Sequence, residues 1–416
     1  MNRRPRLTGR GQVFLALGVV VVALGTLLGY PDITRAGVLV TGLPVLAVVV
    51  GWRPTPPLTL QRLVAPTLVA PEQPAEVELL LRGRGNRLSP LQVAEEQVDP
   101  ILGAGPRFLL PRMDPGERHT VRYRVSSPVR GAHRLGPLRL ERRDPFGMTT
   151  ATVELPGEGR LLVLPRIEAL GPGRVHGGGL GREGQVPHMV ALHGEDDVSI
   201  RAYRDGDDLR RVHWPTTAHR GELMVRQEDR PARRRAVLLL DTRAAAYGDA
   251  AEAFEWAVRA VASLAVHLGE DGYAVHVVGA GEPSRTDLLT VLQSLALVEP
   301  TAQALTRDVR DAHALTAEGA VVVAVVADHD PEAVLAVPAV RSPGSLGVAL
   351  VLDTTSFADD PEVRSWADPD DGDLVPIFTA AGWRTRTVRD GDSVADAWAA
   401  AVPPTPGRRA DLAGLR

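Results

Sequence analysis

The chain has 416 residues, 44% of them hydrophobic, and a formal net charge of −4. It contains no cysteine, and all 47 of its basic residues are arginine, which excludes disulfides, cysteine nucleophiles, thiolate metal sites and lysine-based catalysis. The charge is divided unevenly, because residues 1–235 hold 34 arginines against 24 acidic residues and residues 236–416 hold 13 against 27. Length and asymmetry together predict two or three domains with different surroundings.

Two uncharged segments predict a transmembrane helical hairpin over residues 11–52, after a cytoplasmic N-terminus of residues 1–10. Residues 11–30 and 36–52 carry no charge, and crossing a bilayer takes about 20 apolar residues. We expect the intervening residues 31–35 to form a tight turn. Arginine is concentrated before the first segment and after the second, which predicts that both termini and the soluble domains are cytoplasmic. A cleaved signal peptide and a buried soluble hairpin are the alternatives.

Short alternating runs broken by glycine and proline predict a β-rich, immunoglobulin-like sandwich over residues 57–165. In one such run, Val77, Leu79 and Leu81 are expected to share one face of a strand. Turn signals recur throughout, among them Asp-Pro-Phe-Gly at residues 144–147. A glycine-rich connector is predicted over residues 166–192.

Residues 193–235 contain the densest run of mixed charge in the chain. Three interpretations of this segment are open. His213 and His219 with Asp207 or Asp208 would form an acid/base or metal group, or the arginines would bind phosphate or nucleic acid. The interleaved acidic residues favour the third interpretation, a structural or partner-binding surface of ion pairs.

The same segment carries a family resemblance. The run from Tyr203 to Trp214, followed by Gly221 to Arg226, resembles the signature of the "domain of unknown function 58" family, and residues 144–147 resemble an upstream motif of that family. The resemblance implies von Willebrand factor A-like bacterial membrane proteins that work beside MoxR-type AAA+ ATPases and other membrane proteins of the same gene cluster. The partner-binding residues that it implies are Tyr203, Arg204, Gly206, Asp207, Asp208, Arg210, Arg211, His213, Trp214, Gly221 and Arg226.

Residues 236–402 alternate apolar strands with helices and are followed by a tail, residues 403–416. Near-continuous apolar strands predict a mostly parallel sheet covered on both faces. Asp241, Asp328 and Asp353 each follow a predicted strand, at the edge where such sheets bind ligands.

This region resembles a von Willebrand A domain, which implies Mg²⁺ held by Asp-x-Ser-x-Ser and by a later Asp. Asp241 and Asp328 match the two acidic positions, but Arg243 and Ala245 stand at the serine positions. We therefore expect a vestigial site without a cofactor, in which Asp241 pairs with Arg243 or caps the next segment. Retention of Mg²⁺ is the alternative.

The missing nucleophiles and the altered metal motif predict a protein that is not an enzyme. We interpret the chain as a non-catalytic, membrane-anchored interaction or scaffold protein in contact with the lipid bilayer. The resemblance implies a MoxR-type ATPase partner in the assembly or maturation of other proteins. Two alternatives are a Mg²⁺-dependent von Willebrand A-type ligand-binding module and an arginine-mediated binder of anionic lipid or nucleic acid, although no nucleic-acid partner is expected.

Overall fold

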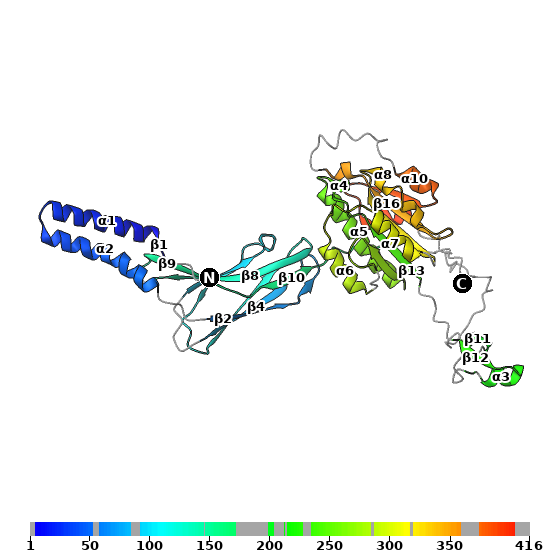
Figure 1. Cartoon of the computed structure of the whole chain (residues 1–416), viewed down its shortest axis with the longest axis horizontal. Coiled ribbons are helices and arrows are strands. Elements are labelled where there is room, and N and C mark those ends of the chain that lie inside the picture. Colours follow the sequence, from blue (N-terminus) through cyan, green and yellow to red (C-terminus); the bar gives the residue numbers. More distant parts are fainter. Residues whose placement is uncertain are drawn as a thin grey trace, which may run out of the picture. The chain divides into compact units, whose positions relative to one another are not determined.

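The computed structural model describes residues 5–52, 58–84, 92–144, 146–171, 199–203, 212, 214–227, 234–283, 287–316, 319–358 and 374–403. The chain divides into two compact units, the first over Met1–Arg166 with Leu295–Leu297 and the second over Ile167–Ser294 and Val298–Arg416. Figure 1 labels the elements of both units.

The first unit begins with α1 (Gly9–Leu27) and α2 (Pro31–Gly51), two helices long and apolar enough to cross a membrane. The predicted pair of apolar segments is thus confirmed as a pair of helices. The predicted turn over residues 31–35 is wrong, because α2 already begins at Pro31 and the chain reverses over residues 28–30. Proline at the first helical position and Asp32 in the first turn both favour a helix start there.

Glycines bring the two helices into backbone contact. A Cβ atom added at Gly18 would lie 2.7 Å from the backbone N of Thr41, and one added at Gly25 would lie 2.6 Å from the backbone N of Thr34. Neither position has room for a side chain, so the approach of α1 to α2 depends on these small residues.

A short strand ties this hairpin to the β module of the same unit. β1 (Arg6–Leu7) pairs antiparallel with β9 (Thr149–Leu155), and Figure 1 shows both strands at the base of the two helices. Thr8 follows β1 and caps α1, since its Oγ1 accepts a hydrogen bond from the backbone N of Gly11.

The β module consists of two sheets. A three-stranded antiparallel sheet has the order β2-β4-β7, and a larger sheet contains the path β1-β9-β8-β10-β3, with β5 paired to β8 and β6 paired to β5. The bounds are β2 (Leu58–Ala65), β3 (Leu68–Val69), β4 (Ala75–Gly83), β5 (Gln92–Val98), β6 (Arg107–Leu110), β7 (Arg118–Val125), β8 (Gly131–Arg143), β10 (Gly159–Val163) and a 3-10 turn at Pro100–Leu102.

One buried cluster is shared by side chains of both sheets. Val77, Leu79 and Leu81 of β4 are fully buried in it, as their alternation predicts, together with Leu138 and Leu161 of the larger sheet. The three-stranded antiparallel sheet and the larger sheet, in which only β10 and β3 of the described strands pair in parallel, therefore share one core. An immunoglobulin-like topology stays a prediction.

The second unit contains the predicted C-terminal parallel sheet. Its order is β14-β13-β15-β16-β17 and every neighbouring pair is parallel. In chain order this is 2-1-3-4-5, a doubly wound arrangement whose order reverses between β13 and β15. The bounds are β13 (Arg235–Leu240), β14 (Ala274–Val278), β15 (Ala320–Ala327), β16 (Gly347–Leu352) and β17 (Arg384–Val388).

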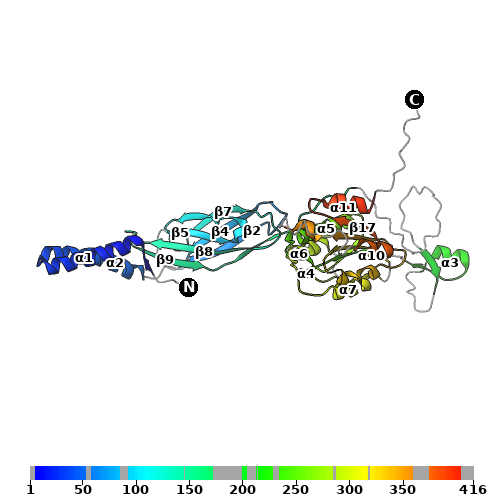
Figure 2. The same ribbon diagram turned by 90° about the horizontal axis from the view of Figure 1, so that it is seen from above.

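Helices cover both faces of this sheet, as Figure 2 shows. α5 (Ala251–Glu270) and α11 (Val394–Ala401) contact one face, and α7 (Thr306–Thr316), α10 (Val375–Ala380) and a 3-10 turn at Val337–Val340 share a buried cluster with the other. The shorter elements are α4 (Ala244–Tyr247), α6 (Leu288–Leu297), α8 (Pro331–Val334) and a 3-10 turn at Thr354–Phe357. Before the sheet, β11 (Ser199–Ala202) pairs antiparallel with β12 (Met224–Gln227), and α3 (Trp214–Arg220) lies between them in sequence.

Candidate functional site

About half of the signature segment, residues 193–235, lies outside the described residues. This holds for seven of the eleven implied partner-binding residues, namely Arg204, Gly206, Asp207, Asp208, Arg210, Arg211 and His213. Arg226 lies in β12, and Tyr203, Trp214 and Gly221 are described.

The described part of the signature segment exposes an aromatic side chain. Trp214 begins α3 and is 66% exposed, and Leu223 is also exposed. Gly221 ends α3 with a positive φ of 73° and donates to the carbonyl of Thr217 at 2.9 Å. The backbone N of Tyr203 donates to the carbonyl of Leu223 at 2.8 Å, which joins the two ends of the segment. An exposed tryptophan and an exposed leucine in the same segment are side chains suited to protein contact.

Asp241 lies at the carboxyl end of β13, at the point where the strand order reverses. Ligands of doubly wound sheets bind at this position. The side chain of Asp241 is nevertheless 0% exposed, and its charge is matched by Arg243, which is 6% exposed.

The guanidinium of Arg243 holds both carboxylate oxygens of Asp241. Nε donates to Oδ1 at 3.0 Å and Nη2 donates to Oδ2 at 2.7 Å. The remaining terminal nitrogen, Nη1, donates to the carboxylate of Asp330 at 3.0 Å. Such a forked pair fixes both distance and orientation. The pairing of Asp241 with Arg243, expected from the sequence as the alternative to a metal, is therefore present.

The ion pair perturbs its surroundings. Burial alone would lower the pKa of Arg243, but the hydrogen bonds and charge of Asp241 raise it. Burial, and then the negative charge of Asp241, raises the pKa of Tyr247 well above its ordinary value. The Tyr247 hydroxyl donates to the carbonyl of Asp241 at 2.8 Å, so this edge of the sheet holds a neutral phenol and a permanent cation.

Asp328 follows β15 but belongs to a separate group of contacts. Its Oδ1 accepts from both the backbone N and the Oγ1 of Thr354, at 3.0 and 2.6 Å. Burial raises its pKa, against the effect of these hydrogen bonds. Among the described residues, no side chain hydrogen-bonds to both Asp241 and Asp328. The side chains that hold Asp241 and Asp328 in place are therefore different, although Asp241 Oδ2 also accepts from the backbone N of Ala327, next to Asp328, at 3.4 Å.

The residues at this edge do not fit a divalent cation. Mg²⁺ needs a near-octahedral set of oxygen ligands, whereas both oxygens of Asp241 accept from a guanidinium and Ala245 has no side-chain oxygen. Within the described ranges, no three His, Asp or Glu side chains converge on a point that could hold a metal ion.

Sequence reasoning missed three residues of this site. Thr301 pairs with the loop after β13, since its carbonyl accepts from the backbone N of Ala244 at 2.7 Å. Asp330 reaches Arg243 across 87 positions of sequence. Asp308 in the first turn of α7 is half-buried, and the negative charge of Asp241 is one of the causes that raise its pKa. Only the folded sheet brings these separate loops to one edge, and no local pattern signals them.

One segment of the chain matches a family model. The model of the family described as "Protein of unknown function DUF58" matches residues 199–336, about a third of the chain. No curated protein sequence matches the chain.

Two solved structures show local likenesses. The CARDB domain of a Pyrococcus furiosus protein in complex with di-metal ions is 16% identical over 26% of this chain and 94% of that one, with a TM-score of 0.20. The Pseudomonas fluorescens alkylpurine DNA glycosylase AlkC, bound to DNA, is 12% identical over 30% of this chain and 40% of that one, with a TM-score of 0.17. At these scores neither likeness bears on the fold or function of this chain.

Proposed function

We propose that this chain is a membrane-anchored, non-catalytic interaction protein that binds a protein partner without a metal ion, through its parallel-sheet edge and the signature segment that precedes the sheet in sequence. The observation that carries the proposal is the Asp241–Arg243 pair. In a metal-dependent module, a bound cation would supply positive charge at the carboxyl end of the first strand. Here the covalently attached guanidinium supplies that charge and occupies both oxygens that a cation would need.

We further propose that the second unit is a von Willebrand A-like domain. The doubly wound strand order and the position of Asp241 at the end of its first strand support this relationship. The partner that the resemblance implies is a MoxR-type AAA+ ATPase. The DUF58 match over residues 199–336 supports the resemblance from which this partner is proposed.

The anchor in this proposal is the α1–α2 hairpin. Its helices contain 19 and 21 residues, and about 20 apolar residues cross a bilayer. The arginines that precede α1 and follow α2 support cytoplasmic placement of both soluble units.

Two measurements on the full chain in detergent test the proposal. Calorimetric titration with Mg²⁺ and Mn²⁺ is expected to show no binding, whereas binding that disappears in Asp241→Ala would favour the metal-dependent alternative. A pull-down of a MoxR-type ATPase encoded beside this gene is expected to succeed with the wild type. Replacing the exposed Trp214 with Ala is expected to weaken it, with Leu289→Ala, which alters an exposed leucine of α6, as the matched control.

A further inference from the structure

The Asp-Pro-Phe-Gly turn, which the proposed function leaves unexplained, lies against the first residues of α1. Thr8 Oγ1 donates to the carbonyl of Gly147 at 2.7 Å, and the backbone N of Thr8 donates to the carbonyl of Met148 at 2.8 Å. A side chain at Gly11, in the first turn of α1, would collide with that same Met148 carbonyl. The turn is thus held at the level where the first apolar helix begins.

This turn presents a large apolar side chain to solvent. Phe146 is 61% exposed. Its backbone N donates to Asp144 Oδ1 at 2.8 Å, and Thr149 donates to Asp144 Oδ2 through its hydroxyl at 3.0 Å and through its backbone N. These bonds to Asp144 hold the backbone at Phe146 and Thr149, on a segment that leaves the phenylalanine exposed.

The end of α2 reaches the same end of the β module. The Nη2 of Arg142, two residues before Asp144, donates to the carbonyl of Gly51 at 2.7 Å. Trp52 follows directly and is 64% exposed. Aromatic side chains with one apolar side are typical of the boundary between the hydrocarbon core and the headgroups.

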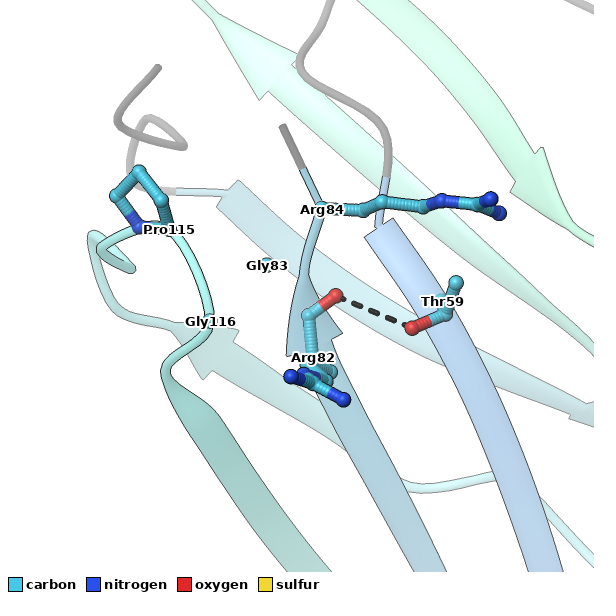
Figure 3. Close-up of a pocket in the computed structure, with 6 residues that line it drawn as sticks. All are labelled: Thr59, Arg82, Gly83, Arg84, Pro115 and Gly116. Atoms are coloured by element: carbon cyan, nitrogen blue, oxygen red, sulfur yellow. Dashed lines mark hydrogen bonds between the residues drawn. The ribbon is translucent and has the colours of Figure 1, made fainter. Parts of the chain in front are cut away.

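Two arginines line an open pocket at this end of the module. Figure 3 shows Arg82 and Arg84 beside Thr59, at the point where β2 begins and β4 ends. β2 begins at Leu58, six residues after Trp52, and six residues span at most about 20 Å. Neither guanidinium forms an ion pair with another described residue. Nearby, Glu117 accepts from the backbone N of Asp114 at 2.6 Å, which closes the adjacent turn.

We propose that this end of the β module, defined by Phe146, Trp52, Arg82 and Arg84, docks onto the anionic headgroup layer of the bilayer that contains α1 and α2. The inference rests on the proposed membrane anchor and deepens it. Phe146 and Trp52 enter the interface, and Arg82 and Arg84 contact lipid phosphates. The module is then attached to the membrane at its surface as well as through the two helices.

Continuity with the helices favours lipid over other occupants. Trp52 follows Gly51, the last residue of α2, and Phe146 precedes Gly147, whose carbonyl accepts from Thr8 at the start of α1. Both aromatic side chains are therefore close to the headgroups of any bilayer that contains the two helices. Each arginine close to an anionic surface shifts binding by about fivefold, since it contributes about 1 kcal/mol.

Single-site fluorescence tests the docking in the full chain. Because the chain lacks cysteine, Phe146→Cys, Leu17→Cys and Val129→Cys each accept one environment-sensitive label. Leu17 lies in α1. Val129 is exposed and lies just before β8, so it is at the opposite end of that strand from Arg143 and the turn that carries Phe146. Each protein is reconstituted into vesicles of phosphatidylcholine with or without phosphatidylglycerol, containing nitroxide lipids that quench at shallow or deep positions.

We expect the label at 146 to be quenched by shallow nitroxides, the label at 17 by deep nitroxides, and the label at 129 by neither. In the vesicles containing phosphatidylglycerol, Arg82→Gln with Arg84→Gln should reduce quenching at 146, whereas Arg124→Gln, which alters an arginine near the opposite end of β7, should not. Quenching at 17 without quenching at 146 would overturn the docking and leave the anchor intact. Absence of quenching at 17 would overturn the anchor itself, and the docking with it.

Discussion

Arg62 on β2 and Glu96 on β5 form an ion pair of 2.6 Å inside the β module, with side chains that are 1% and 0% exposed. The hydroxyl of Tyr123 on β7 donates to the same Glu96 oxygen at 3.3 Å. β2 and β7 belong to the three-stranded sheet and β5 to the larger one, so these side chains connect the two sheets. Burial raises the pKa of Glu96, against the effect of Arg62.

Removal of one partner of this pair is expected to destabilise the β module strongly. Glu96→Leu should lower the free energy of unfolding by about 3–5 kcal/mol, because a buried guanidinium is left without its counter-charge. The double variant Arg62→Met with Glu96→Leu should recover most of that loss. Urea unfolding of the full chain in detergent, followed by circular dichroism, measures both.

An exposed pair provides the control. Arg134→Met breaks an exposed contact with Glu158 of 2.7 Å and should cost less than about 1 kcal/mol. If Arg62→Met with Glu96→Leu were as unstable as Glu96→Leu alone, the two buried charges would not act as a pair.

Arg243→Met is expected to destabilise the second unit strongly. Asp241 would remain buried with its charge unmatched, at a cost of about 3–5 kcal/mol. Arg389 forms an ion pair with Asp353 at 3.3 Å in which its own side chain is 72% exposed, and Arg389→Met should change stability by less than about 1 kcal/mol. Thermal unfolding of both variants checks the contrast, and equal losses would argue against a special role for Arg243.

Asp308 is expected to make stability depend on pH. Burial, reinforced by the charge of Asp311, raises its pKa from 3.8 to about 6. Because this pKa is raised, the folded state favours the protonated, neutral carboxyl. The stability that the protonated Asp308 contributes is fully present below about pH 4 and is lost as pH rises through about 6. Asp308→Asn should therefore gain stability relative to the wild type between pH 4 and 7, by about 1 kcal/mol after solvent screening.

The matched control for Asp308 is Asp287, whose pKa is lowered by hydrogen bonds from Thr290. Asp287→Asn should show the opposite sign in a lower pH range, because a lowered pKa stabilises the folded state above about pH 4 and this stability is lost only as pH falls further. Its loss of stability relative to the wild type should therefore stay constant from about pH 4 to 7. Melting temperatures recorded from pH 4 to 7 measure both variants, and parallel profiles for wild type and Asp308→Asn would refute the prediction.

Gly18→Leu is expected to separate α1 from α2, because its side chain would overlap the backbone of Thr41. Gly42, on α2, has no atom near its Cβ position, so Gly42→Leu should leave the hairpin intact. Spin labels at Leu17 and Val45 report the distance between the helices by electron resonance. Only Gly18→Leu should lengthen it, and an unchanged distance would mean that the contact is not set by glycine.

Sequence patterns predicted the elements better than the contacts between them. Alternation identified the buried face of β4, and apolar runs identified the parallel strands, because burial imposes a period on each strand. The helix start at Pro31 was missed, although proline at a first helical position is a known signal. The contacts of Arg62 with Glu96 and of Arg243 with Asp330 join distant segments, and neither segment carries a local pattern that identifies its partner.

The pairing of β1 with β9, together with the bond from Thr8 to Gly147, has a mechanical consequence. These contacts make the hairpin and the β module move together. β8 has 13 residues and spans roughly 40 Å at about 3.3 Å per residue. A tilt of the helices by about 10° would move the far end of that strand by about 7 Å, within the ordinary range of helix tilts. With the proposed membrane anchor, changes in bilayer thickness or lateral pressure would in this way displace the end of the module that lies farthest from the helices.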